Sequence, residues 1–120
     1  MTYSEDKKKA IMAAYKSDFD HIKKEIEETH KKAQKLNKRA REIWERAHRG
    51  IHEKMEHFER IYEFVGSYPI EEFQKKEGEI SRAWGELKNA FDRGLAGIHG
   101  EPTEEEDQKM KKEHHSLLDI

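Results

Sequence analysis

The sequence predicts an all-α fold, namely a long antiparallel helical hairpin of the coiled-coil type with a short, weak C-terminal helix. Apolar residues recur every three or four positions over most of the chain, which is the helical period. The strongest turn signal before residue 97 is the Val-Gly-Ser-Tyr-Pro segment at residues 65–69. Charged residues make up 42% and hydrophobic residues 33% of the 120 residues, which favours slender helices over a many-layered core.

The first predicted helix covers residues 4–65. Its apolar stripe runs from Ile11 to Val65 in steps that average about 3.6 residues, so it stays on one side of a nearly straight helix. A helix of about 60 residues is roughly 90 Å long. Only Asn37 and Gly50 interrupt it, and two alternatives stay open: a break at Gly50, or a tight turn at Asn37 that would give three helices of about 30 residues in a bundle.

The second predicted helix covers residues 69–97. Glycine suits the residue just past a helix end and proline suits the first turn of the next helix, so the two helices should form a tight hairpin. The apolar spacing of the second helix is close to the 3.5-residue repeat of coiled coils. Its small residues either form a face that admits a third helix closely or mark a helix that frays from Gly94 onward; they are Ala83, Ala90, Gly94 and Gly97.

Residues 1–98 therefore form the predicted hairpin, and residues 99–120 form a linker and a weak C-terminal helix. Thr103 and Glu106 have the spacing of a capping box, so the helix should begin just after Thr103. Its apolar content is thin, and we expect it to dock weakly. The apolar residues are Met110, Leu117, Leu118 and Ile120.

In this hairpin the second helix is half as long as the first, so the N-terminal part of the apolar stripe has no cover within the chain. A large exposed apolar stripe marks an interaction surface. We expect a homodimer that completes a four-helix bundle, with the C-terminal segment or a different protein as the alternative cover. The expected interface residues are Ile11, Tyr15, Phe19, Ile22 and Ile26.

A basic run at residues 31–49 predicts an alternative function. It holds eight Lys and Arg residues against two Glu residues, most of them opposite the stripe. A straight basic helix face could follow the phosphates of a nucleic acid in a salt-sensitive, sequence-independent way. The nucleic-acid-binding residues in this alternative are Lys31, Lys35, Lys38, Arg39, Arg46 and Arg49.

The chain has eight histidines, of which His48 and His52 lie four residues apart and are weak candidates for a metal site. Their acidic neighbours Glu45 and Glu56 face solvent, so we expect neither a metal nor a cofactor. For histidines beside the stripe, burial would lower their pKa values, so acidification would destabilise the protein. Nearby carboxylates would raise the pKa values, so acidification would stabilise it. The third alternative is that all of them are exposed and pH has no effect.

The sequence shows no catalytic arrangement, and we do not expect an enzyme. The chain has no cysteine and no apolar run long enough to cross a membrane, so we expect an intracellular, cytoplasmic protein. The preferred function is a non-enzymatic helical interaction protein, such as an adaptor, assembly factor or inhibitor, that presents helix faces to an unidentified protein partner. The alternative is a nucleic-acid-binding accessory protein.

Overall fold

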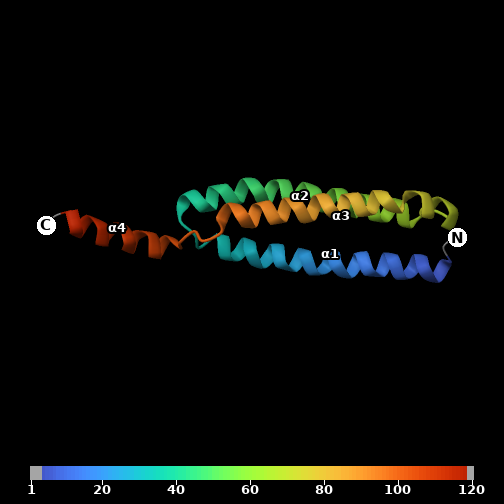
Figure 1. The fold of residues 1–120 in the computed structure, drawn as a ribbon, viewed down its shortest axis with the longest axis horizontal. Helices are drawn as coiled ribbons and strands as arrows, with labels where there is room; N and C mark the ends of the chain where they lie inside the picture. The colour runs from blue at the N-terminus through green and yellow to red at the C-terminus, as the bar shows by residue number, and fades with distance from the viewer. Residues whose placement is uncertain (1–3, 119–120) are drawn as a thin grey trace.

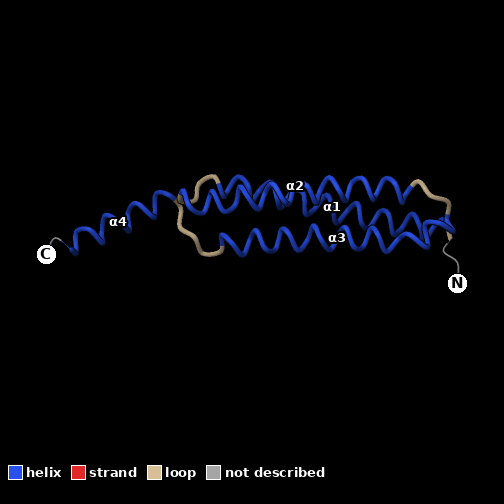
Figure 2. The backbone as a smooth tube through the Cα atoms, turned by 90° about the horizontal axis from the view of Figure 1, so that it is seen from above, coloured by secondary structure: helices blue, strands red, loops and turns tan. Residues whose placement is uncertain are grey.

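The computed structural model describes the backbone of residues 4–118 and the side chains of residues 4–111. The four helices of this part of the chain are α1 (Glu5–Ala33), α2 (Lys38–Gly66), α3 (Ile70–Ile98) and α4 (Glu104–Leu118). The first three lie side by side as an up-down-up bundle, and α4 projects beyond one end of it (Figures 1 and 2). The shape is elongated, at 76 × 20 × 19 Å. The predicted all-α fold is confirmed, and the hairpin is formed by α2 and α3.

The predicted continuous helix over residues 4–65 is wrong, because the chain turns at residues 34–37 between α1 and α2. Asn37 holds this turn: its Oδ1 accepts from the amide of Ala40 at 2.9 Å and so caps α2. The amide of Asn37 donates to the carbonyl of Pro102 at 3.1 Å. Its side-chain amide donates to a Glu101 carboxylate oxygen at 3.3 Å. The three-helix alternative is the one observed, because folding back at Asn37 lets α1 bury its stripe on its own chain.

The other predicted helix boundaries agree with the structure. The turn after Gly66 and the start of α3 after Pro69 lie where the sequence places them. The hydroxyl of Thr103 accepts from the amide of Glu106 at 3.1 Å, as expected for the first turn of α4. The side chains of Leu117 and Leu118, and all of Ile120, lie outside the described residues.

The core runs along the axis of the three-helix bundle and is apolar throughout the described residues. Its largest side chain, that of Trp44, is fully buried, and Phe58 stacks on Phe19 of α1 with ring centroids 4.9 Å apart. A methyl group added to Gly94 would lie 3.2 Å from both Ile51 and Trp44, so α2 and α3 approach closely at this glycine. The helix α3 continues through Gly94 to Ile98 instead of ending there.

Candidate interaction surfaces

The apolar stripe of α1 is covered by the chain itself, so the expectation that it is left bare is wrong. Phe19, Ile22 and Ile26 are buried in the core, and Ile11 and Tyr15 are half-buried against it. The three-helix arrangement provides this cover because α3 lies parallel to α1 along its full length (Figure 1). The structure therefore removes the reason for expecting a dimer built on an exposed stripe.

A cluster of histidines joins α1 to α2 near the turn at residues 34–37. His30 of α1 stacks on His48 of α2 with ring centroids 4.2 Å apart. The indole Nε1–H of the buried Trp44 donates to Nδ1 of His30 at 3.0 Å. Burial is the main cause that lowers the pKa of His48, and neighbouring His30 adds to it, while Glu45 acts in the opposite direction. This cluster is a hydrogen-bonded ring stack between two helices.

The two weak metal candidates line one hollow together with His30 but have different nearest partners. His48 lies against His30, whereas Nε2 of His52 lies 2.9 Å from a carboxylate oxygen of Glu56 on the solvent side of α2. Among the described residues, no group of three or more His, Cys, Asp or Glu side chains is placed to hold a metal ion. Two imidazoles on one exposed helix lack the further ligands that structural metal sites use.

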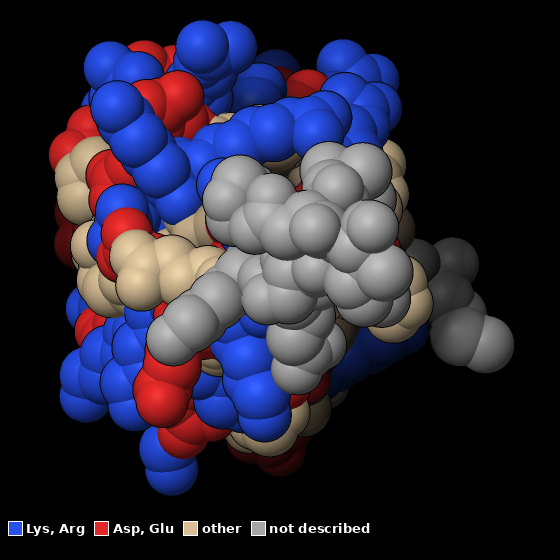
Figure 3. Space-filling model, turned by 90° about the vertical axis from the view of Figure 1, so that its left-hand side faces the viewer, with Lys and Arg blue, Asp and Glu red and all other residues tan. Residues whose placement is uncertain are grey.

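The basic run does not form one straight face, because the turn at residues 34–37 divides it. Lys31 lies in the last turn of α1, Lys35 in the turn after it, and Lys38 and Arg39 begin α2. These four exposed side chains gather at the end of the bundle from which α4 projects. Seen from this end, Lys and Arg side chains cover much of the rim, with Asp and Glu between them (Figure 3). Arg46 and Arg49 are also exposed, but they lie further along α2.

Acidic residues of the loop before α4, and of α4 itself, neutralise part of this basic end. Arg41 Nη1 lies 3.1 Å from a carboxylate oxygen of Glu104, and the two side chains are partly exposed. The first turn of α4 adds Glu105, Glu106 and Asp107. The end of the bundle is therefore a mixed surface in which basic residues of α1 and α2 face acidic residues of α4.

The helix α4 is bonded to the bundle through its first residues. Leu36 and Thr103 form an isolated antiparallel bridge, and the amide of Glu104 donates to the carbonyl of Lys35 at 2.9 Å. Beyond these contacts α4 extends away from the bundle in both views (Figures 1 and 2). The side chain of Met110 is 57% exposed. Within the described residues, α4 thus contributes no side chain to the hydrophobic core.

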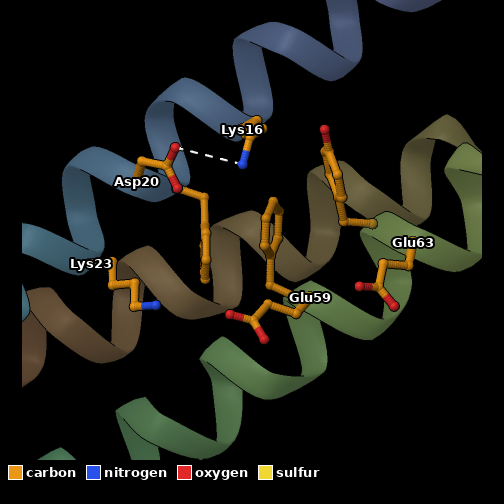
Figure 4. A pocket seen from close by; sticks show the side chains of 8 residues that line it. Lys16, Asp20, Lys23, Glu59 and Glu63 are labelled. Carbon is orange, nitrogen blue, oxygen red and sulfur yellow. Dashed lines mark ion pairs between the residues drawn. The ribbon is translucent and has the colours of Figure 1, made fainter.

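A shallow hollow on the side of the bundle lies between α1 and α2 and is one of several candidates for a small-molecule site. Its volume is about 280 Å³, and its floor is formed by aromatic side chains that belong to the core. Charges of both signs surround it, and Lys16 lies 3.8 Å from Asp20 (Figure 4). The hollow lacks the enclosure of a ligand pocket. It is lined by Lys16, Phe19, Asp20, Lys23, Phe58, Glu59, Tyr62 and Glu63.

Sequence reasoning did not identify two features. The Trp44–His30 bond joins residues that the straight-helix prediction places far apart, so only the turn at Asn37 could have suggested it. Phe64 is 66% exposed and meets Tyr68 edge to face, with centroids 5.6 Å apart, at the opposite end of the bundle. Its position off the apolar stripe of α2 was the available signal for its exposure.

Comparison with known proteins gives no relative: no protein family, curated protein or solved structure matches this chain. In the described part of the chain, no helix combines the length and apolar character needed to cross a membrane.

Proposed function

We propose that the protein is a non-enzymatic interaction protein of the cytoplasm, an adaptor, assembly factor or inhibitor, that binds a protein partner through α4. The observation that carries this proposal is the projection of α4 beyond the bundle, with Met110 57% exposed. An isolated helix of 15 residues is only marginally stable in water. A partner with a groove for one helix face would provide the packing that α4 lacks on its own chain.

The three-helix bundle acts in this proposal as a rigid carrier for α4. The bridge between Leu36 and Thr103 and the cap of Thr103 on Glu106 fix the first turn of α4. The direction in which α4 leaves the bundle is thereby set before a partner binds. Pre-ordering of this kind reduces the entropic cost of association.

Site-specific photocrosslinking tests this proposal. A photoreactive amino acid at Met110 should give an adduct of defined mass in extracts of the native host, and excess unlabelled protein should abolish it. The matched control is the same photoreactive group at Arg82, an exposed position on the middle of α3. Equal adducts from both positions, or none from Met110, would contradict a binding role for α4.

Nucleic-acid binding is the second candidate, supported by the gathering of Lys31, Lys35, Lys38 and Arg39 at one end of the bundle. Such a compact basic end would contact a few phosphates, so its affinity should fall steeply with salt. We expect retention on DNA or RNA at about 50 mM salt that is lost by about 200 mM. The variant Lys35→Glu/Arg39→Glu should weaken the retention, whereas Lys16→Glu on the side of the bundle should not. Absence of retention at low salt would exclude this function.

A further inference from the structure

The turn between α1 and α2 contains neither glycine nor proline, and the Asn37 cap is its one local turn signal. Residues 34–37 are Gln-Lys-Leu-Asn, without glycine or proline, and no non-glycine residue in the described chain has a positive φ. The turn between α2 and α3, by contrast, follows Gly66 and ends at Pro69. Glutamine, lysine and leucine are all good helix formers. The segment can therefore adopt a helical conformation without strain.

The apolar pattern stays in helical phase through this turn. Ala33 and Ala40 are both fully buried, and the half-buried Leu36 lies between them in sequence at steps of three and four. If residues 34–37 became helical, these three side chains would share one face with the stripes of α1 and α2. The sequence thus supports a straight α1–α2 helix and the observed turn almost equally well.

The helix α1 is also the most separable part of the bundle. The helices α2 and α3 approach closely at Gly94 and at Gly97, where an added methyl group would lie 3.2 Å from Ile43. Fewer residues of α1 approach them closely, and its contacts are made by long side chains such as Phe19. At its N-terminal end, Lys8 Nζ donates to the carbonyl of Tyr68 at 2.7 Å. The hairpin of α2 and α3 is a unit on which α1 docks.

From these three observations we propose that α1 exchanges between two copies of this chain. Residues 34–37 become helical, α1 and α2 merge into one helix of roughly 90 Å, and α1 packs on the α2–α3 hairpin of the second copy. A second copy is the occupant because its α2–α3 hairpin offers the same groove for α1. In that groove Phe19 would stack on Phe58 and His30 would accept from Trp44, as they do within one chain. The proposal does not rest on a binding role for α4, and it differs from a dimer built on a bare stripe.

The balance between the closed and exchanged forms depends on the turn, on the bonds that the turn makes to the loop before α4, and on the charge of the basic run. Opening removes the Asn37 cap and the backbone bonds that residues 35 and 37 make to Glu104 and Pro102. It restores helical hydrogen bonds across residues 34–41. It also places two copies of the basic run next to each other at the midpoint of the dimer. The dimer should therefore form more readily at high salt, where these charges are screened.

Two variants shift this balance in opposite directions. Asn37→Ala removes the cap and favours a continuous helix, so the dimer dissociation constant should fall by roughly tenfold or more, since a dimer has two such turns. Lys38→Pro fits the observed turn, because proline is favoured at the first helical position and the extended Asn37 can precede it. Within a continuous helix the same proline would be strongly unfavourable. We expect this variant to remain monomeric in sedimentation equilibrium at all concentrations.

Interchain crosslinking identifies the exchange directly, even if Asn37→Ala folds poorly. The chain has no cysteine, and Lys16 of α1 and Glu59 of α2 line the same hollow (Figure 4). One chain carries Lys16→Cys, the other carries Glu59→Cys, and the two are unfolded and refolded together at high concentration. A short bismaleimide should then give covalent heterodimers, which Lys38→Pro in both chains should abolish. No heterodimer, or a dimer that this reagent does not link, would overturn the proposal.

Discussion

The indole Nε1–H of Trp44 lies 3.0 Å from Nδ1 of His30, and this bond joins the buried core of α2 to the edge of α1. Trp44 is fully buried, so its N–H group depends on this acceptor. Nδ1 is the acceptor in this bond, so the ring nitrogen of His30 that is left to donate is Nε2. The ring is held further by stacking on His48. These contacts tie the turn-proximal end of α1 to α2.

Replacing His30 by Phe should destabilise the protein by about 1–3 kcal/mol, because the buried indole N–H loses its acceptor. The comparison that isolates this bond is the same substitution in a Trp44→Phe background, where no N–H remains. There we expect a smaller cost, with a coupling energy of about 1 kcal/mol in a double-mutant cycle. Urea unfolding gives all four free energies. Equal costs in both backgrounds would contradict a stabilising role for the bond.

Acidification should destabilise the bundle through His48. Burial, then His30, lowers the pKa of His48 in the folded protein below its ordinary value of 6.5. The unfolded chain therefore binds more protons in this range, so the stabilisation is complete above about pH 6.5 and is lost as the pH falls towards the folded value. Melting temperatures at pH 7.5 and pH 5.5 measure this loss.

The control for the pH experiment is a pair of single substitutions. His48→Gln should reduce the difference between the two melting temperatures. His21→Gln is the matched surface control and should leave this difference nearly unchanged, because the side chain of His21 is 77% exposed. A pH response that survives in His48→Gln would assign the effect to other groups.

Alanine substitutions at two glycines of α3 should change the stability of the protein in opposite directions. A methyl group on Gly78 meets nothing within 4 Å, so Gly78→Ala should stabilise the protein by about 0.5–1 kcal/mol through helix propensity. A methyl group on Gly94 would meet Ile51, Trp44 and Ala47 at 3.2–3.3 Å. Trp44 and Ile51 are fully buried and cannot move aside, so Gly94→Ala should cost about 1–3 kcal/mol. Thermal unfolding compares the two, and a stabilising Gly94→Ala would show that the helices have room to separate.

Ending the chain after Asp107 should leave the stability of the three-helix bundle nearly unchanged, within about 0.5 kcal/mol. This truncation keeps the Leu36–Thr103 bridge and the Arg41–Glu104 ion pair, and removes only the projecting part of α4. Far-ultraviolet circular dichroism should record the lost helix while the melting temperature stays constant. A large fall in melting temperature would mean that the removed residues pack on the bundle.

Local signals in the sequence predicted the fold class and three of the four helix starts. Pro69 and Thr103 act through their own backbone neighbours, so the sequence was enough to place α3 and α4. The turn at Asn37 could not be decided in this way. Its cap on Ala40 is local, but its bonds to Glu101 and Pro102 join residues more than 60 positions apart. The apolar stripe has the same phase in both conformations and therefore could not decide between them.

The predicted apolar interface and the predicted basic face both depend on whether the chain turns at Asn37. With a straight helix, Ile22 and Ile26 appear bare and Lys31 to Arg49 appear as one long face. With the turn, the same isoleucines are buried and the basic residues divide between two helices. The weak docking of α4 was better predicted, because its polar composition leaves few residues that could pack on the bundle.

The hydrogen bonds of Asn37 have a mechanical consequence. Its amide and side chain hold the loop that leads into α4, so the root of α4 and the turn between α1 and α2 move as one piece. The 15-residue helix α4 extends from the loop that Asn37 holds. A load on α4 therefore acts on Asn37, in the turn between α1 and α2, which contains neither glycine nor proline.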